Sequence, residues 1–227
     1  MKLLCPELNE PIHFYKESRL VELILENKRT YANTVKSLVG QMRENLDELW
    51  SLYDNETNHG SLNFCKSIAL VLDPFSYDVN IHSVTSKINE ELLSIANDED
   101  NYLDTNTLKD ELAKYAHKLL QKMPEDIEIA YSIDIDNLLK ALHFQVLLQS
   151  DDILDSLYDY LCVLTDWGSI SLTVFIGLRS YVDDVDMQSL IDMLIHKGIN
   201  VLFIEGYEQP IVSGLRRIIV DESHCVL

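Results

Sequence analysis

Apolar residues along this chain follow two patterns, one typical of buried strands and one typical of amphipathic helices. Short runs that are apolar throughout predict strands that are covered on both faces. Longer runs in which apolar residues recur every three or four positions predict helices that bury one side. The predicted strands are residues 19–25, 68–72, 127–131, 143–148, 170–176, 199–204 and 215–220. The predicted helices are residues 28–50, 81–95, 103–120, 133–142, 151–167 and 183–196.

The order of these elements predicts an α/β fold. Strands and helices alternate through most of the chain, as expected for a parallel-rich sheet with helices on its faces. The alternation breaks once, where two long helices follow each other between residues 81 and 120 with no strand between them. We therefore expect an α/β head domain formed by residues 1–78 and 125–227, with residues 79–124 inserted as a smaller helical domain.

Composition supports a folded protein in the cytoplasm. Hydrophobic residues make up 47% and charged residues 25%, which is typical of globular domains. The four cysteines lie far apart and form no CxxC pair, so we expect reduced thiols rather than a zinc or redox motif. The N-terminus meets Pro6 and acidic residues too early to form a signal peptide, and no apolar run is long enough to span a membrane.

The junction after the first predicted strand lacks the glycines of a nucleotide site. Residues 26–30 read Glu-Asn-Lys-Arg-Thr, and neither GxxxxGK[ST] nor GxGxxG is present. A phosphate loop needs glycines so that consecutive backbone N–H groups can point at the ligand. Lys28, Arg29 and Thr30 could still hold a phosphate by their side chains, and a charged helix start is the alternative interpretation.

Acidic clusters are the clearest chemical signal. The net charge is −20, which taken alone argues against nucleic acid as a partner and fits a soluble surface or the binding of divalent cations. Glu125, Asp126 and Glu128 lie on or beside a predicted strand, and Asp134 and Asp136 follow at the next turn. Calcium takes six to eight oxygen ligands, largely from carboxylates and carbonyls. Calcium binding and plain solvated charge both fit this cluster. The sequence contains no GxSxG elbow and no pair of histidines at helical spacing, so neither motif indicates a catalytic centre.

Several segments resemble one known family in their order and spacing. They are LNEPIHF, RLVELILENKRTYANTVKSLV, SIALVLDPFSYDVN, IEIAYSIDIDNLLKALHFQV, SLTVFIGLRSYV and INVLFIEGYE. Together they resemble the small accessory protein of type II-A CRISPR–Cas systems that is required for acquiring new spacers. The resemblance covers nearly the whole chain and rests on joint order rather than on one invariant motif.

The resemblance implies a fold and a function. It implies an α/β head of P-loop-like topology without a working phosphate loop, joined to a helical leg, which would be residues 79–124. It further implies a homotetrameric ring that binds the ends of double-stranded DNA without sequence preference. Calcium ions would stabilise the ring, no catalytic activity is established for the family, and the partners would be the CRISPR integrase proteins and the effector nuclease.

The resemblance also directs attention to particular residues. The acidic cluster falls where the family places calcium ligands, and Asp126 and Glu128 match best. Ala130 and Ser132 stand where the family is often acidic, which leaves the number of calcium sites open. The basic residues that we expect to contact DNA are Lys28, Arg29, Lys36, Arg43 and Lys140.

Two other functions remain open at this stage. The first is a metal-dependent nuclease or degenerate nucleotide hydrolase that uses the acidic residues between Glu125 and Asp136, because two-metal nucleases also gather carboxylates. The second is an acidic interaction module with no nucleic-acid partner.

Overall fold

The structure is a computed structural model, and it divides into two compact units. It describes the chain except for residues 45–48, 55–59, 125–126, 128–132, 149, 151, 224 and 227. Met1–Val79 and Leu148–Leu227 form the first unit, called here the α/β unit, and Asn80–Leu147 form the second, called the helical unit. No helix in the described part of the chain is long and apolar enough to cross a membrane.

A parallel five-stranded sheet forms the centre of the α/β unit and confirms the predicted α/β fold. In spatial order its strands are β6 (Ile68–Val71), β7 (Leu172–Ile176), β8 (Val201–Glu205), β3 (Leu20–Leu25) and β9 (Arg216–Val220). All neighbouring pairs are parallel. Every residue of β3 and β8 is buried, which is why their sequences read as continuous runs and not as alternating ones.

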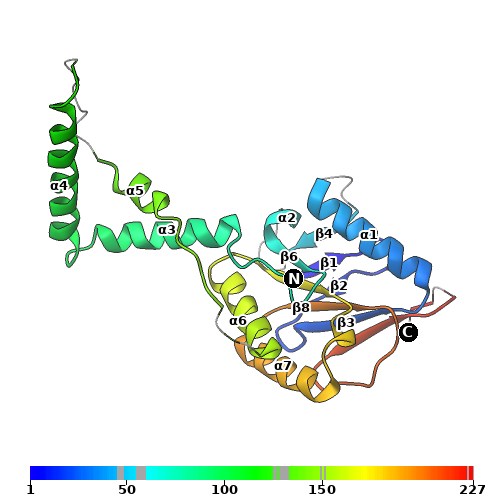
Figure 1. Cartoon of the computed structure of the whole chain (residues 1–227). Coiled ribbons are helices and arrows are strands. Elements are labelled where there is room, and N and C mark those ends of the chain that lie inside the picture. Colours follow the sequence, from blue (N-terminus) through cyan, green and yellow to red (C-terminus); the bar gives the residue numbers. More distant parts are fainter. Residues whose placement is uncertain are drawn as a thin grey trace. The chain divides into compact units, whose positions relative to one another are not determined.

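Helices cover both faces of this sheet (Figure 1). Helix α1 (Lys28–Glu44) lies on one face, and α6 (Ile153–Asp166) and α7 (Asp184–Lys197) lie on the other. Aspartates start both of the latter helices: Asp152 accepts hydrogen bonds from two backbone N–H groups of α6, and Asp183 does so for α7. The predicted helices 151–167 and 183–196 are therefore confirmed, with the aspartates as caps.

A second, antiparallel sheet was not predicted. It consists of β1 (Lys2–Leu4), β2 (Ile12–His13), β4 (Ser51–Tyr53) and β5 (Ser61–Leu62), in the order β2-β1-β4-β5, and a short helix α2 (Phe64–Ser67) follows it. Strands of two or three residues are too short to show a periodic pattern. Buried Gln41 ties α1 to this sheet, because its amide bonds both the backbone N–H and the carbonyl of Trp50, at 2.8 and 2.7 Å.

Three helices make up the regular part of the helical unit. They are α3 (His82–Ala96), α4 (Tyr102–Leu120) and α5 (Ile135–Ala141). The hydroxyl of Thr105 donates to the carbonyl of Ala96 at 2.7 Å and fixes the turn between α3 and α4. Helix α5, which the sequence analysis placed in the head, contacts α3 and so falls within the helical unit.

The strand predicted at residues 143–148 is wrong. His143 has a left-handed φ of 51°, which turns the chain after α5 rather than starting a strand. Further on, the side chain of Asn80 takes both backbone hydrogen bonds of Val146, at 2.7 and 3.1 Å. An asparagine side chain thus replaces the neighbouring strand that the pattern predicted. The strand predicted at 127–131 lies outside the described residues, apart from Ile127, which is not in a strand.

A buried carboxylate joins three parts of the α/β unit. Glu22 in β3 is fully buried, and its two oxygens accept hydrogen bonds from Arg179 at 2.8 Å and from Arg217 of β9 at 2.7 Å. Arg179 belongs to the short 3₁₀ helix η1 (Leu178–Ser180), which follows β7. It also bonds Asp184, at the start of α7, and the carbonyl of Pro210. This network, called here the Glu22 network, holds the loops after β7 and β8 against the sheet.

Replacing Glu22 should destabilise the protein strongly. Glu22→Ala leaves the Arg179 side chain, which is 1% exposed, without its buried carboxylate. Removing one partner of a buried ion pair costs about 3–5 kcal/mol of unfolding free energy. Urea denaturation of the full chain measures this loss, and Glu17→Ala, at an exposed position nearby, should change the free energy by less than about 0.5 kcal/mol. Equal effects of the two variants would contradict the role given to Glu22.

Candidate nucleic-acid interface

The side chain of Asn27 closes the junction between β3 and α1. The Oδ1 atom of Asn27 accepts hydrogen bonds from the backbone N–H groups of Arg29 and Thr30, at 3.0 and 3.2 Å. These are the N–H groups at the helix start that a phosphate loop would offer to its ligand. An asparagine cap takes them up here, so the glycine-free sequence has a direct structural counterpart.

A tyrosine lies over the neighbouring strand ends. Gly177 follows β7 and Gly206 follows β8, and Tyr31 from the first turn of α1 packs on both. A Cβ atom at Gly206 would lie 3.7 Å from the Tyr31 ring, and one at Gly177 would lie 3.5 Å from its hydroxyl. The carboxyl ends of parallel strands are the usual ligand position in such folds. In this protein an aromatic side chain covers that position above β7 and β8.

A second buried acid lies at the carboxyl end of β8. Glu205 ends β8, is 1% exposed, and accepts a hydrogen bond from the backbone N–H of Arg179 at 3.1 Å. The pKa of Glu205 is raised to about 7, chiefly by burial and to a smaller extent by nearby Glu22, while the hydrogen bond and charge of Arg179 oppose the rise. The carboxyl group is therefore partly protonated at neutral pH.

Helix α1 presents a basic face to solvent. Arg29, Lys36 and Arg43 follow each other at intervals of seven residues, so they lie along one line of the helix, and Lys28 stands beside this line. All four are exposed, whereas Thr34, Leu38 and Gln41 on the opposite side are buried. Residues 28–43 contain no Asp or Glu. We call these four residues the α1 basic face.

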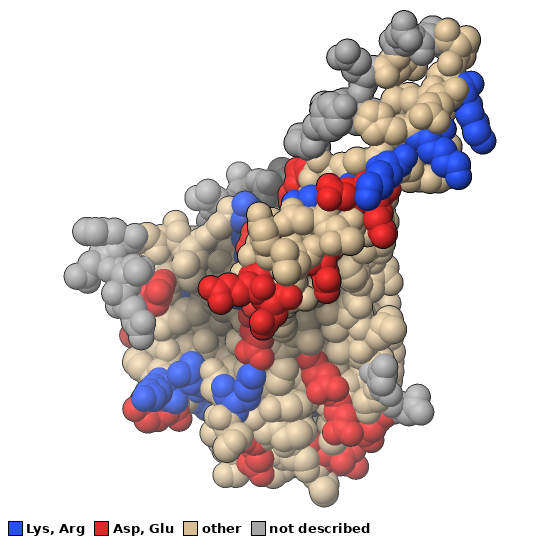
Figure 2. All heavy atoms as spheres, turned by 90° about the vertical axis from the view of Figure 1, so that its left-hand side faces the viewer, with Lys and Arg blue, Asp and Glu red and all other residues tan. Residues whose placement is uncertain are grey.

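The cations of the α1 basic face have no carboxylate partners among the described residues. The ion pairs found there involve Lys140, Arg179, Lys197 and Arg217 instead. Figure 2 shows, for one side of the molecule, several groups of Lys and Arg, some of which lie directly beside Asp and Glu. A net charge of −20 is therefore compatible with local surfaces that are basic.

Lys140 differs from the other four predicted basic residues. It lies on α5 in the helical unit and forms an ion pair with Asp136, four residues earlier. The hydrogen bond from Lys140 to Asp136 raises the pKa of the lysine. Because a carboxylate already neutralises this ammonium group locally, Lys140 is a weaker candidate for a phosphate contact than the α1 basic face.

The predicted calcium ligands are only partly described. Glu125, Asp126 and Glu128 lie outside the described residues. Asp134 caps α5, accepting from the Asp136 N–H at 3.0 Å and from the Asn137 side chain at 2.9 Å. Both described acids offer the oxygen donors that calcium prefers, although each already has a partner within α5. In the part of the chain that the structure describes, no three metal-binding side chains gather around one point.

A second basic stretch, on and after α4, was not predicted from the sequence. Lys114 and Lys118 lie four residues apart on α4, Lys122 follows just beyond the helix, and all three are exposed. The spacing KYAHKLLQK carries this signal. It was hidden by the acidic residues Asp110 and Glu111 earlier on the same helix.

Comparison with known proteins adds one match. The family model described as CRISPR-associated protein (Cas_Csn2) matches residues 41–224, which is most of the chain. A search of curated proteins finds no relative.

The raised pKa of Glu205 predicts how stability changes with pH. The folded protein holds the Glu205 proton more tightly than the unfolded chain, where glutamate titrates near 4.5. Its contribution therefore favours folding at low pH and is lost as the pH rises from about 4.5 to about 7. Glu205→Gln keeps an acceptor for Arg179 and removes this loss, which is on the order of 3 kcal/mol.

Urea unfolding at pH 5, 6, 7 and 8 measures the difference. Between pH 5 and 8 the free energy of unfolding should fall less in Glu205→Gln than in the unmodified chain. Glu222→Gln, at an exposed position, should follow the unmodified chain. Parallel pH profiles for Glu205→Gln and the unmodified chain would contradict the assignment.

Proposed function

This chain belongs to the Cas_Csn2 family of CRISPR-associated proteins, and from that premise we propose that it binds the ends of double-stranded DNA during spacer acquisition. The binding is independent of sequence and does not cleave the DNA. The protein acts in the cytoplasm as a calcium-stabilised homotetrameric ring, beside the CRISPR integrase proteins and the effector nuclease.

The α1 basic face is the observation that carries this proposal. Four exposed cations that have no carboxylate partner among the described residues, in a chain of net charge −20, form a surface suited to the phosphate backbone. Contacts of this kind position a protein on DNA but read no sequence. A tetramer would carry 4 × −20 = −80. DNA binding therefore requires the four α1 basic faces to line the surface that meets the duplex.

Exposed apolar side chains on the helical unit support an assembly of several copies. Large apolar residues on α4 are exposed along its whole length: Tyr102, Leu103, Leu108, Tyr115 and Leu119. Leu108, Tyr115 and Leu119 lie at helical spacing on one side of α4 and form an apolar surface of the kind typical of protein–protein contacts. We propose that α4 buries this surface against other copies of the chain.

Calcium would act through the acidic residues that follow α4 and extend into the first turn of α5. Glu125, Asp126, Glu128, Asp134 and Asp136 are the proposed ligands, and the ion would neutralise part of the acidic charge there. For Asp136 to contribute, its carboxylate must be shared with, or released from, Lys140. Calcium binding is thus expected to free Lys140 for other contacts.

The strand order supports a head of P-loop-like topology without nucleotide chemistry. Strand β3 lies inside the sheet, between β8 and β9, and leads directly into α1. The Asn27 cap and the Tyr31 ring fill the positions where such a head would hold phosphates. Nothing in the arrangement of the described residues favours the nuclease or hydrolase alternative.

One set of incubations separates the three functions. The pure protein is mixed with linear and closed-circular duplex, with and without calcium, at low salt. Binding that requires ends and leaves the DNA intact supports the proposal. Cleavage of either DNA would support a metal-dependent nuclease, and no binding at low salt would support an acidic interaction module.

Removing the α1 basic face should weaken binding and reduce its dependence on salt. In Arg29→Ala/Lys36→Ala/Arg43→Ala, each lost phosphate contact should lower the slope of log affinity against log salt by about 0.9, roughly 3 in total. Fluorescence anisotropy of a labelled duplex between low and physiological salt measures both quantities.

A charge-matched variant controls for the change in net charge. Lys16→Ala/Lys66→Ala/Lys197→Ala removes three exposed cations of the α/β unit from outside α1. It should keep most of the affinity and nearly the full salt slope. Equal losses in the two triple variants would show that net charge, and not the α1 basic face, controls binding.

A further inference from the structure

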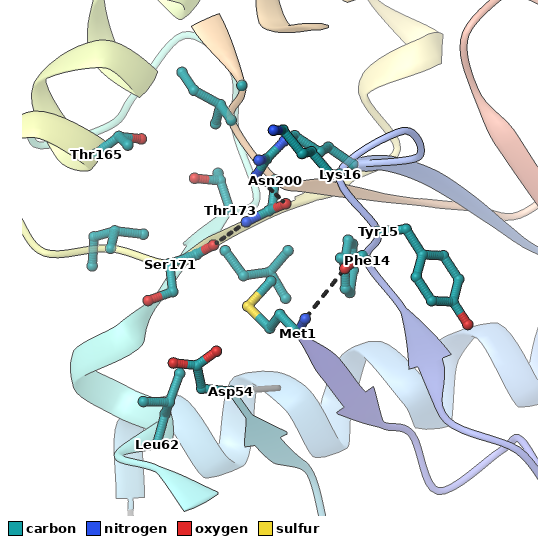
Figure 3. A pocket seen from close by; sticks show the side chains of 15 residues that line it. Met1, Phe14, Tyr15, Lys16, Asp54, Leu62, Thr165, Ser171, Thr173 and Asn200 are labelled. Carbon is teal, nitrogen blue, oxygen red and sulfur yellow. Dashed lines mark hydrogen bonds between the residues drawn. The ribbon is translucent and has the colours of Figure 1, made fainter. Parts of the chain in front are cut away.

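Among the described residues of the α/β unit, two cavities have a size that suits small molecules. The first, of about 610 Å³, lies at the amino ends of β7 and β8 and contains Lys16, Arg19 and Asp54 (Figure 3). Arg19 bonds Asn200 and packs on Gly198, at the carboxyl end of α7. Since the carboxyl end of a helix carries partial negative charge, this arginine is already compensated and the cavity gains little from an anion.

The second cavity, of about 660 Å³, contains an arginine that is not compensated. It is lined by the loop at residues 8–11, by His13 and Tyr15, and by Arg216 and its neighbours in β9. Arg216 donates one hydrogen bond to the carbonyl of His13 at 2.6 Å, while its Nε atom is buried without an acceptor. In the described part of the chain it has no carboxylate partner, unlike Arg217 and Arg179.

A half-buried guanidinium that has no carboxylate partner among the described residues is a favourable binding position for an anion. Burial lowers the pKa of Arg216, which reflects the cost of holding the charge there. Arginine matches phosphate oxygens well because its donors form a planar fork. Among the described residues, Glu10 is the one carboxylate lining the cavity, and it is exposed, so solvent screens its repulsion.

An aromatic stack stands beside this arginine. The rings of His13 and Tyr15 are stacked, with centroids 5.4 Å apart and planes inclined by 9°. Tyr15 is 51% exposed, and its ring points away from the first cavity (Figure 3). The outer face of such a ring is a platform on which a nucleobase can stack.

We propose that this second cavity binds a mononucleotide group, with its phosphate monoester at Arg216 and its base on Tyr15. The volume lies within the range of small-molecule sites, roughly 300–1,000 Å³. Two sources carry this chemistry: a free nucleotide, and the 5′-phosphorylated end of a DNA strand. Binding of the DNA end would extend the proposed function and rests on it. Binding of a free nucleotide is independent of the proposed function.

Titration calorimetry with thymidine 5′-monophosphate tests the site. The full chain should bind this nucleotide, and thymidine or inorganic phosphate alone should bind at least tenfold more weakly, because each offers half of the contacts. Arg216→Lys keeps the charge but loses the fork, and it should weaken binding of the nucleotide at least tenfold. Tyr15→Ala removes the stacking platform and should weaken it about fivefold or more.

Control variants make the result decisive. Tyr181→Ala removes a similarly exposed tyrosine of the α/β unit that does not line this cavity, and it should leave nucleotide binding unchanged. Absence of nucleotide binding, or equal binding by the unmodified chain and by Tyr15→Ala, would overturn the proposal. If Arg216→Lys folds poorly by circular dichroism, Tyr15→Ala decides alone.

Duplexes with and without a 5′-phosphate identify the source. A preference for phosphorylated ends that Arg216→Lys removes would identify the DNA end. Nucleotide binding without such a preference would identify a free nucleotide. Either result would support the second cavity as a mononucleotide site. The triple variant of the α1 basic face should retain nucleotide binding, so failure of the duplex proposal and failure of this site can be told apart.

Discussion

The α/β unit depends on the burial of one carboxylate in its first central strand. Glu22 sits in β3 with no access to solvent, and two arginines from later parts of the chain neutralise it. An unpaired charge at this depth would cost several kcal/mol. The chain can therefore complete this sheet only when η1 and β9 are in place. The Glu22 network thereby fixes the edge where Glu205, Tyr31 and the start of α1 meet.

Charge in this protein is organised by position rather than by total. Acids dominate the composition, yet several of them are used locally: Asp152 and Asp183 cap helices, and Glu22 is buried between arginines. The cations of the α1 basic face, in contrast, are left without partners in the described structure. A net charge of −20 thus conceals a surface that can attract phosphate, because long-range repulsion is screened beyond about 10 Å at ordinary ionic strength.

The sequence was informative where structure is local or continuously buried. Residues 68–72 and 199–204 could be recognised as strands because both faces are covered, and the helix starts at Asp152 and Asp183 because caps act within one turn. The antiparallel sheet could not be found, since its strands of two or three residues are defined only by their pairing, which includes residues as far apart in the sequence as Leu3 and Leu52. The strand predicted at residues 143–148 was wrong because strand-like composition cannot reveal that the Asn80 side chain takes the place of a neighbouring strand. Sequence placed Lys28, Arg29, Lys36 and Arg43 on one helix. It could not show that Lys140 pairs with a carboxylate, or that the Nε atom of Arg216 is buried without an acceptor among the described residues.

The spacing of Arg29, Lys36 and Arg43 has a consequence for movement along DNA. Seven residues of helix advance about 10.5 Å, and successive phosphates of one strand lie about 3.4 Å apart along the duplex axis. The phosphates also turn about the axis as they rise, so a straight helix crosses the strand instead of following it. Under the proposed function, the duplex still repeats the same arrangement of phosphates at every nucleotide step. A shift by one nucleotide would then present an equivalent set of phosphates to the same cations. Such a protein can drift along the duplex with little resistance, and only a physical obstacle, such as another bound protein, would determine where it stops.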